Sequence, residues 1–263
     1  MNLSIADHPI IHDRLSCLRH RDTGPEAFRR CLHQITALLV SEAARLLPLR
    51  EIETPTPLVT ARSKVLARPV VVVPILRAGL GMVQGVLSLL PEASIGHIGL
   101  ARNEETKLPE KYYSKFPPHL EAADVILVDP MLATGGSAVE AVSQLKAAGA
   151  RHLIFLCIIA APEGWEHFHA THPDVPVFTA ALDDGLTPAA FITPASATRA
   201  TDTAGRSKNL FRIWNSTILT VRGSRPGALC GARRHPCCCG TLRSARRIAQ
   251  AMPRAPTACR GRP

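Results

Sequence analysis

One stretch of the sequence, VILVDPMLATGGS at residues 125–137, strongly limits how the chain can fold. Its first four residues are all apolar, which predicts a strand buried on both faces, as in the centre of a parallel sheet. Asp129 follows at the expected carboxyl end of that strand. The small residues at 133–137 then predict a turn whose backbone N–H groups point into one concavity.

A helix is expected directly after this turn. Val139, Val142 and Leu145 recur on one helical face, and Gly149 is a suitable stop. The positive end of the helix dipole would add to the amides of the turn, so the whole unit suits a phosphate group. A Thr-Gly-Gly-Ser turn can also be a plain connection between a strand and a helix, and the residues alone leave both interpretations open.

Other segments define the expected fold class. Further buried strands are predicted at residues 69–73, 94–100, 153–161 and 175–182. Residues 8–47 have helical spacing, and residues 48–65, with three prolines, predict an extended excursion or an edge strand. A short helix is expected after the Pro-Glu-Gly turn at 162–164, and residues 183–186 predict a turn. This order predicts an α/β fold, an open and mostly parallel sheet flanked by helices, with an N-terminal helical arm.

A second strand end also has the composition of a ligand loop. Arg77 lies among small residues in the segment PILRAGLGM, where the backbone can approach a ligand closely and a guanidinium can bind phosphate. Arg102 follows the strand predicted at 94–100. Because strand ends of an open parallel sheet meet ligands in one crevice, we expect Arg77, Arg102 and Asp129 at one edge. As charges alone, both arginines favour the interpretation of solvent-exposed turn residues.

These segments resemble a known family. DPMLATGGS resembles the ribose 5-phosphate loop of the type I phosphoribosyltransferases, and Pro130 after Asp129 is similar to the uracil phosphoribosyltransferases in particular. PILRAGLGM, RNEET, AAPEG and HPIIHDRLSCLRHRDT also resemble segments of that family. The resemblance covers about residues 8–194. It implies the type I phosphoribosyltransferase fold and transfer of phosphoribose from phosphoribosyl pyrophosphate (PRPP) to uracil, giving UMP and pyrophosphate, in pyrimidine salvage.

The resemblance also implies ligands and the residues that bind them. PRPP would be bound by Arg77, Arg102, Asp129, Pro130, Met131, Leu132, Ala133, Thr134, Gly135, Gly136 and Ser137. Uracil would be held at Ile192, and no residue is assigned as a catalytic group or as a ligand of a resident metal. Mg²⁺ would arrive with PRPP rather than in a protein cage. A homo-oligomer is expected, GTP is a candidate effector, and residues 107–120 would form a mobile hairpin over the site.

Charge divides the chain into two parts. Residues 195–263 hold 14 of the 31 Lys and Arg but one of the 21 acids, so they carry +13 while residues 1–194 carry −3. This predicts a domain at 1–194, for which the resemblance implies a phosphoribosyltransferase, and a poorly ordered basic tail rich in Arg, Ala, Pro and Cys at 195–263. Specific nucleic-acid binding is not expected, because the tail has little aromatic interleaving. Its cysteines also lack the CxxC spacing that suits zinc.

The resemblance stops after the sequence FITP at residues 191–194. The family continues with a glycine-rich GLGDAGD that holds uracil, whereas this chain reads ASATRAT. GC-rich codons for GLGDAGD, read one base late, give ASATRAT, so we hypothesise a frameshift between Pro194 and Ala195. Thr198 then replaces an acid near the donor, which predicts that PRPP binding survives better than uracil binding. The alternative function is a noncatalytic protein that binds PRPP or UMP and contacts RNA through its tail.

The remaining features bear on location and metals. The cysteines at 17, 31 and 157 are scattered, which indicates a reducing compartment and core packing. No basic segment precedes an apolar run at the N-terminus, and the longest apolar run, at 153–161, is too short to cross a bilayer. We therefore expect a cytoplasmic protein without membrane contact. His167, His169 and His172 lack metal-ligand spacing and are expected at the surface.

Overall fold

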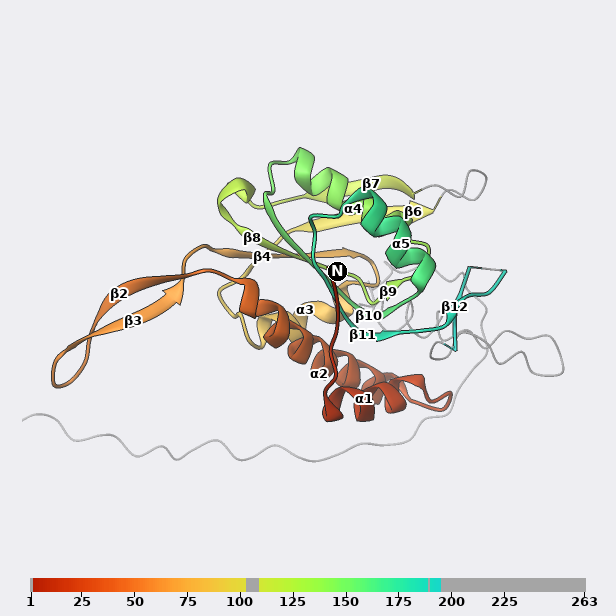
Figure 1. Ribbon diagram of the computed structural model, residues 1–263, viewed down its shortest axis with the longest axis horizontal. Helices are drawn as coiled ribbons and strands as arrows, with labels where there is room; N and C mark the ends of the chain where they lie inside the picture. The colour runs from red at the N-terminus through yellow and green to blue at the C-terminus, as the bar shows by residue number, and fades with distance from the viewer. Residues whose placement is uncertain (1, 103–108, 189, 195–263) are drawn as a thin grey trace, which may run out of the picture. The chain divides into compact units, whose positions relative to one another are not determined.

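The structure is a computed structural model that describes residues 2–102, 109–188 and 190–194. Its central sheet has the strand order β1-β11-β10-β8-β4-β6-β7, with β5 beside β4 and β9 beside β10 (Figure 1). These strands are β1 (Leu3–Ile5), β4 (Val70–Leu76), β5 (Ser94–Ile95), β6 (His97–Arg102), β7 (Pro109–Lys115), β8 (Asp124–Val128), β9 (Met131–Leu132), β10 (His152–Ala160) and β11 (Val177–Leu182). Every pairing is parallel except that of β6 with β7. The predicted open, mostly parallel sheet is confirmed.

Helices cover both faces of this sheet. On one face lie α1 (Pro9–Arg19), α2 (Pro25–Ala43) and α3 (Leu80–Leu87), and on the other lie α4 (Gly136–Ala147) and α5 (Pro162–Thr171) (Figure 1). Successive strand residues point to opposite faces, so Val72 and Ile126 pack with the first helix group while Val73 and Leu127 pack with the second. The unbroken apolar runs seen in the sequence therefore supply two hydrophobic cores at once.

The N-terminal helical region differs from its prediction. The helical spacing at 8–47 is divided into α1 and α2, followed by a 3₁₀ turn at Ala44–Leu46. The break falls at Gly24, which is extended with ψ 162°, because a proline disfavours helical geometry in the residue before it and suits the first position of a new helix. The short strand β1 was not predicted, since three residues are too few to show an alternating pattern.

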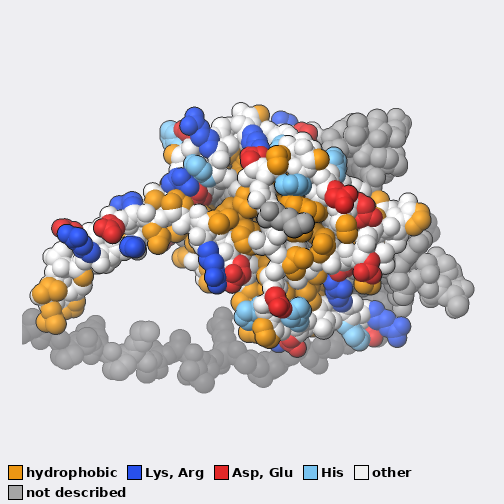
Figure 2. All heavy atoms as spheres, viewed as in Figure 1, with side chains coloured by type: hydrophobic (Ala, Val, Ile, Leu, Met, Phe, Trp, Pro, Cys, Tyr) orange, Lys and Arg blue, Asp and Glu red, His pale blue; other side chains and the backbone are white. Residues whose placement is uncertain are grey.

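Residues 48–65 form a separate hairpin. Strands β2 (Leu49–Pro55) and β3 (Thr60–Leu66) pair antiparallel with each other and project from the central sheet (Figure 1). The predicted extended structure is confirmed, but neither strand joins the edge of the central sheet. The tip is apolar and open to solvent: Leu58 is 93% exposed and Val59 is 68% exposed (Figure 2).

Three smaller differences concern strand ends. The strand predicted at 94–100 is interrupted at Gly96, which separates β5 from β6. The turn predicted at 183–186 is part of a small hairpin of β12 (Gly185–Leu186) and β13 (Ile192–Thr193). The hairpin predicted at 107–120 is not seen in its described part, because β7 pairs with β6 rather than with a strand inside that range, and a 3₁₀ turn follows at Leu120–Ala122. Residues 103–108 lie outside the described part.

The predicted tail, including Ala195 and Thr198, also lies outside the described residues, so the tail and the frameshift stay predictions. Cys31 and Cys157 are buried, as core packing predicts. Within the described ranges, no helix combines the length and apolarity that a membrane span requires.

Candidate active site

The ends of three neighbouring parallel strands bring the predicted PRPP residues to one edge of the sheet. Strand β4 lies between β8 and β6, with Pro74 level with Val128 and Leu76 level with Gly99. The loop of Arg77 leaves β4, Asp129 follows β8, and Arg102 ends β6. The backbone therefore places all three segments at the carboxyl ends of adjacent strands, where α/β sheets bind ligands.

The loop after β4 lies tightly against the end of β8. A Cβ atom on Gly79 would lie 2.4 Å from the carbonyl oxygen of Val128 and 2.8 Å from the nitrogen of Ile75, so only glycine fits there. The Gly79 N–H donates to the Ile75 carbonyl at 2.9 Å, and the peptide bond between Leu76 and Arg77 is cis. Arg77 itself is exposed. Arg77 is therefore accessible from solvent after the carboxyl end of β4.

Carbonyl groups of the loop after β9 face the start of α5. The Leu132 carbonyl accepts a hydrogen bond from the Ala161 N–H at 2.9 Å. The Thr134 carbonyl lies 2.8 Å from Nδ1 of His167, and since a carbonyl can only accept, this nitrogen carries the proton and donates. The carbonyls of Leu132 and Thr134, on either side of Ala133, are thus hydrogen-bonded by Ala161 and by His167 of α5.

The Ala133 carbonyl completes this set. It packs on Gly164, in the first turn of α5, where an added Cβ would lie 2.2 Å from the oxygen. In a trans peptide the C=O and the following N–H point in opposite directions. Because the carbonyls of residues 132–134 lie against α5 and the residue before it, the N–H groups of residues 133–135 are expected on the opposite side, an arrangement that would suit an anion.

The start of α4 adds to this donor set. Gly135 adopts φ +80°, a conformation that favours glycine, and a Cβ there would also lie 2.7 Å from the Gly164 carbonyl. Helix α4 begins at the next residue, so its first N–H groups have no partner within the helix and lie at the positive end of its dipole. The predicted helix is confirmed, with Val142 and Leu145 buried and Gly149 at φ +99° beyond its end.

Asp129 stands half-buried beside this loop. Its backbone N–H donates to the Leu156 carbonyl at 3.1 Å, which ties it to the neighbouring strand β10. Burial raises the pKa of its carboxyl to about 8, and a hydrogen bond from the Met131 N–H acts in the opposite direction. At neutral pH the ligand-free carboxyl is therefore mainly protonated.

The small β12–β13 hairpin is held from two sides. Glu163, in the first turn of α5, accepts a hydrogen bond from the Leu186 N–H at 2.9 Å. Arg19, from α1, contacts the buried Asp183 with Nη2 and Oδ1 at 2.6 Å. Ile192 is 5% exposed, and its side chain packs into the core.

Two contacts of α5 were not predicted as functional. Glu163 was interpreted as part of turn chemistry and His167 as a surface residue. His167 is indeed exposed, but it also binds the loop carbonyl of Thr134. Neither contact has a local signal, because the partners are 23 and 33 positions apart.

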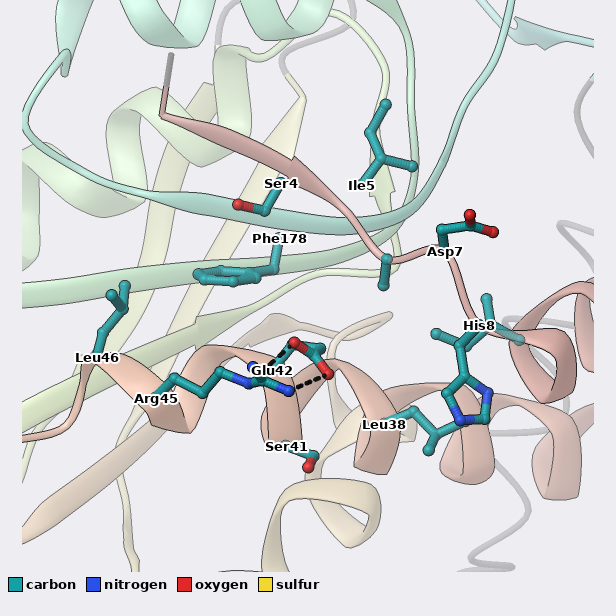
Figure 3. Close-up of a pocket in the computed structure, with 12 residues that line it drawn as sticks. Ser4, Ile5, Asp7, His8, Leu38, Ser41, Glu42, Arg45, Leu46 and Phe178 are labelled. Carbon is teal, nitrogen blue, oxygen red and sulfur yellow. Dashed lines mark hydrogen bonds and ion pairs between the residues drawn. The ribbon is translucent and has the colours of Figure 1, made fainter.

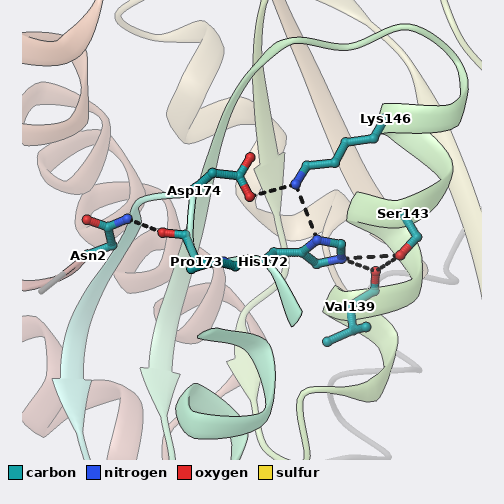
Figure 4. Close-up of polar contacts among 7 residues, drawn as sticks. All are labelled: Asn2, Val139, Ser143, Lys146, His172, Pro173 and Asp174. Atoms are coloured by element: carbon teal, nitrogen blue, oxygen red, sulfur yellow. Dashed lines mark hydrogen bonds and ion pairs between the residues drawn. The ribbon is translucent and has the colours of Figure 1, made fainter. Parts of the chain in front are cut away.

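The surface prediction for His172 is wrong. This side chain is 6% exposed and lies between α4 and the end of α5 (Figure 4). Nε2 is 3.1 Å from the Val139 carbonyl and 3.2 Å from the Ser143 hydroxyl, while Nδ1 is 3.3 Å from the Lys146 ammonium. His172 follows the end of α5 and packs against α4, which explains its burial.

Among the described residues, no group of His, Cys, Asp or Glu side chains lies close enough together to hold a metal ion.

A groove of about 480 Å³ lies elsewhere in the fold, and none of the predicted PRPP or uracil residues lines it. It is bounded by β1 and the following residues, the C-terminal half of α2, and Phe178 (Figure 3). Glu42 and Arg45 form an ion pair in its wall, with Nε 3.1 Å from Oε2.

The sheet and its strand-end loops define a phosphoribosyltransferase fold, as the resemblance predicted. Residues 5–203 match the family described as uracil phosphoribosyltransferase. The chain is 49% identical over 191 residues to the uracil phosphoribosyltransferase of Ligilactobacillus salivarius, an alignment that covers 72% of this chain and 91% of that protein. The corresponding protein of Ureaplasma urealyticum is 51% identical, with 72% and 92% covered. The chain belongs to the uracil phosphoribosyltransferase family.

A solved structure supports the same fold. The AQ2163 protein from Aquifex aeolicus is 34% identical and superposes with a TM-score of 0.71, covering 74% of this chain and 94% of that one.

The packing of Gly164 generates a first prediction. Gly164→Ala should lower the free energy of unfolding by about 2 kcal/mol, because the new methyl group overlaps the Ala133 carbonyl and the surrounding backbone cannot yield. Gly24→Ala is the matched control, since a Cβ there meets no atom within 4 Å. Urea unfolding of both variants provides the comparison, and equal stability of the two would contradict the close packing.

The pKa of Asp129 generates a second prediction. A carboxyl with a pKa raised from 3.8 to about 8 binds more protons in the folded than in the unfolded chain between those values. The contribution of this carboxyl to the free energy of unfolding is complete below the pKa of the unfolded chain. It is lost as the pH rises through the pKa of the folded chain. Wild type should therefore become steadily less stable relative to Asp129→Asn between about pH 4 and pH 8. Urea unfolding at several pH values measures this, and parallel curves would contradict it.

Proposed function

We propose that the chain transfers the phosphoribosyl group of PRPP to N1 of uracil, releasing pyrophosphate and giving UMP. The observation that carries the proposal is the packing of the carbonyls of residues 132–134 against Ala161, Gly164 and His167, from which we infer that the N–H groups of residues 133–135 face the opposite side. Family membership supports the choice of substrates. Such a reaction needs no covalent nucleophile, because positive charge develops at C1 of the ribose as pyrophosphate leaves.

In this proposal the donor is bound by three segments. The amides of residues 133–137 and the dipole of α4 hold the 5-phosphate, since they present several donors and a positive potential. Asp129 lies beside them and receives the ribose hydroxyls. Arg77 and Arg102, on the two neighbouring strand ends, neutralise the departing pyrophosphate. Mg²⁺ enters as part of the PRPP substrate, and its charge would favour the ionised form of Asp129.

The acceptor side depends on the hairpin that leads to Pro194. Because the Ile192 side chain is buried, uracil would be recognised by main-chain groups at and after this strand. The residues that follow, ASATRAT, lack the glycines and the acid of the family's GLGDAGD segment. Donor binding should therefore be retained while uracil turnover is impaired.

An assay of UMP formation tests both the activity and its impairment. The 263-residue chain should bind PRPP but form UMP weakly or not at all. Replacing residues 195–263 by a GLGDAGD-containing ending should raise kcat/KM by at least about tenfold, since close backbone contacts to uracil return. A chain ending at Pro194 is the control, because it separates loss of the tail from gain of the loop.

The outcomes discriminate between the candidates. Full activity of the unaltered chain would contradict impairment. PRPP binding without UMP formation even after the ending is restored would favour the noncatalytic alternative, and salt-sensitive RNA binding that disappears with the tail would add an RNA contact to it. Adding GTP to the same assay tests the predicted effector, and location in the cytoplasm stays a prediction.

A homo-oligomer is part of the proposal. Leu58 and Val59 form an apolar tip on the β2–β3 hairpin, where their side chains are 93% and 68% exposed. Leu58→Ser with Val59→Ser should lower the mass measured by light scattering while leaving the free energy of unfolding nearly unchanged. Leu89→Ser, which changes another exposed apolar residue, is the control. An unchanged mass in the hairpin variant would exclude the tip from the interface.

A further inference from the structure

We propose that His167 is a positioning residue for the sugar-phosphate loop, acting through the Thr134 carbonyl to aim the Gly135 N–H at the 5-phosphate. This inference rests on the proposed function and extends it to a residue outside the loop itself. His167 lies in the second turn of α5, and its exposed ring meets the loop from the helix side with Nδ1 2.8 Å from the carbonyl oxygen.

The proton of the imidazole is assigned by this contact. A carbonyl oxygen only accepts, so Nδ1 must be the donor whether the ring is neutral or charged. Within the described ranges, His167 is the one side chain that hydrogen-bonds a carbonyl of residues 132–134; the Leu132 carbonyl is bound by a backbone N–H and the Ala133 carbonyl packs on Gly164. The last carbonyl of the set therefore depends on a single side chain.

The peptide between Thr134 and Gly135 links this contact to the ligand. Fixing its C=O toward α5 fixes its N–H in the opposite direction, toward the outward-facing donor set. This peptide most needs an external restraint, because it precedes two successive glycines and Gly135 sits at φ +80° without a side chain to limit it. When this N–H donor is already ordered before binding, the entropic cost of ordering it is not subtracted from the free energy of binding.

His169 is a natural control on the same helix. Its ring stacks on Trp165 with centroids 4.7 Å apart, and it has no hydrogen bond to the loop. Removing it deletes an imidazole from α5 without altering the Thr134 carbonyl. Loss of general helix stability and loss of loop positioning can therefore be separated.

Calorimetric titration of the full 263-residue chain with ribose 5-phosphate and, separately, with inorganic pyrophosphate tests the inference. His167→Ala should weaken ribose 5-phosphate binding by about three- to tenfold, the range for one hydrogen bond, and leave pyrophosphate binding unchanged. His167→Asn should restore binding to within about twofold, because its amide can donate from nearly the same position. His169→Ala should bind both ligands as wild type does.

The outcomes separate this inference from the proposed function. If wild type binds neither ligand, the proposed function fails. If wild type binds ribose 5-phosphate and His167→Ala binds it equally well, the inference is overturned while the function stands. Equal weakening of both ligands, or failure of His167→Asn to restore binding, would also overturn it, since the effect would then not act through a donor to the loop.

Discussion

The site depends on the contact between the loop at residues 132–134 and the start of α5. A phosphate loop needs several N–H groups that point in the same direction. An isolated segment of backbone does not keep that arrangement unless its C=O groups are also satisfied. Here the carbonyls on the other side of the same peptides are satisfied by the Ala161 N–H and by His167, and the absence of a side chain at Gly164 allows the loop to come close. The face that we propose for anion binding would thus be a consequence of how its opposite face is packed.

The sheet supplies the rigid frame that this contact requires. Strands β4, β8 and β10 are apolar on both faces, so helices on each side pack against them and leave their carboxyl ends as the accessible edge. Loops at such an edge can carry polar groups that the core could not tolerate. Asp129 lies near enough to the core that burial raises its pKa to about 8, yet it is still partly exposed at the end of β8.

Local patterns predicted the central strands, α4 and the loop between them, because each is specified by residues close together in the sequence. The family resemblance added the ligand and the strand-end arginines. What escaped prediction depends on distant partners: β1 acquires its strand form by pairing with β11, His172 is buried by α4, and Glu163 meets Leu186 across 23 positions. No periodicity encodes such contacts, so a histidine on a polar helix was interpreted as a surface residue.

The packing also separates the two halves of the site. Among the described residues, the loop proposed to hold the donor is contacted from the start of α5 as far as His167. The proposed acceptor side is built on the hairpin at 185–193, which is held by Glu163 and, through Asp183, by Arg19. The described contacts of the loop carbonyls involve residues before Pro194 only. Helix α5 nevertheless touches both halves, with Gly164 and His167 under the donor loop and Glu163 on the hairpin. A shift of this one helix would therefore move donor and acceptor groups together, which ties their mutual distance to the packing of α5 rather than to either loop.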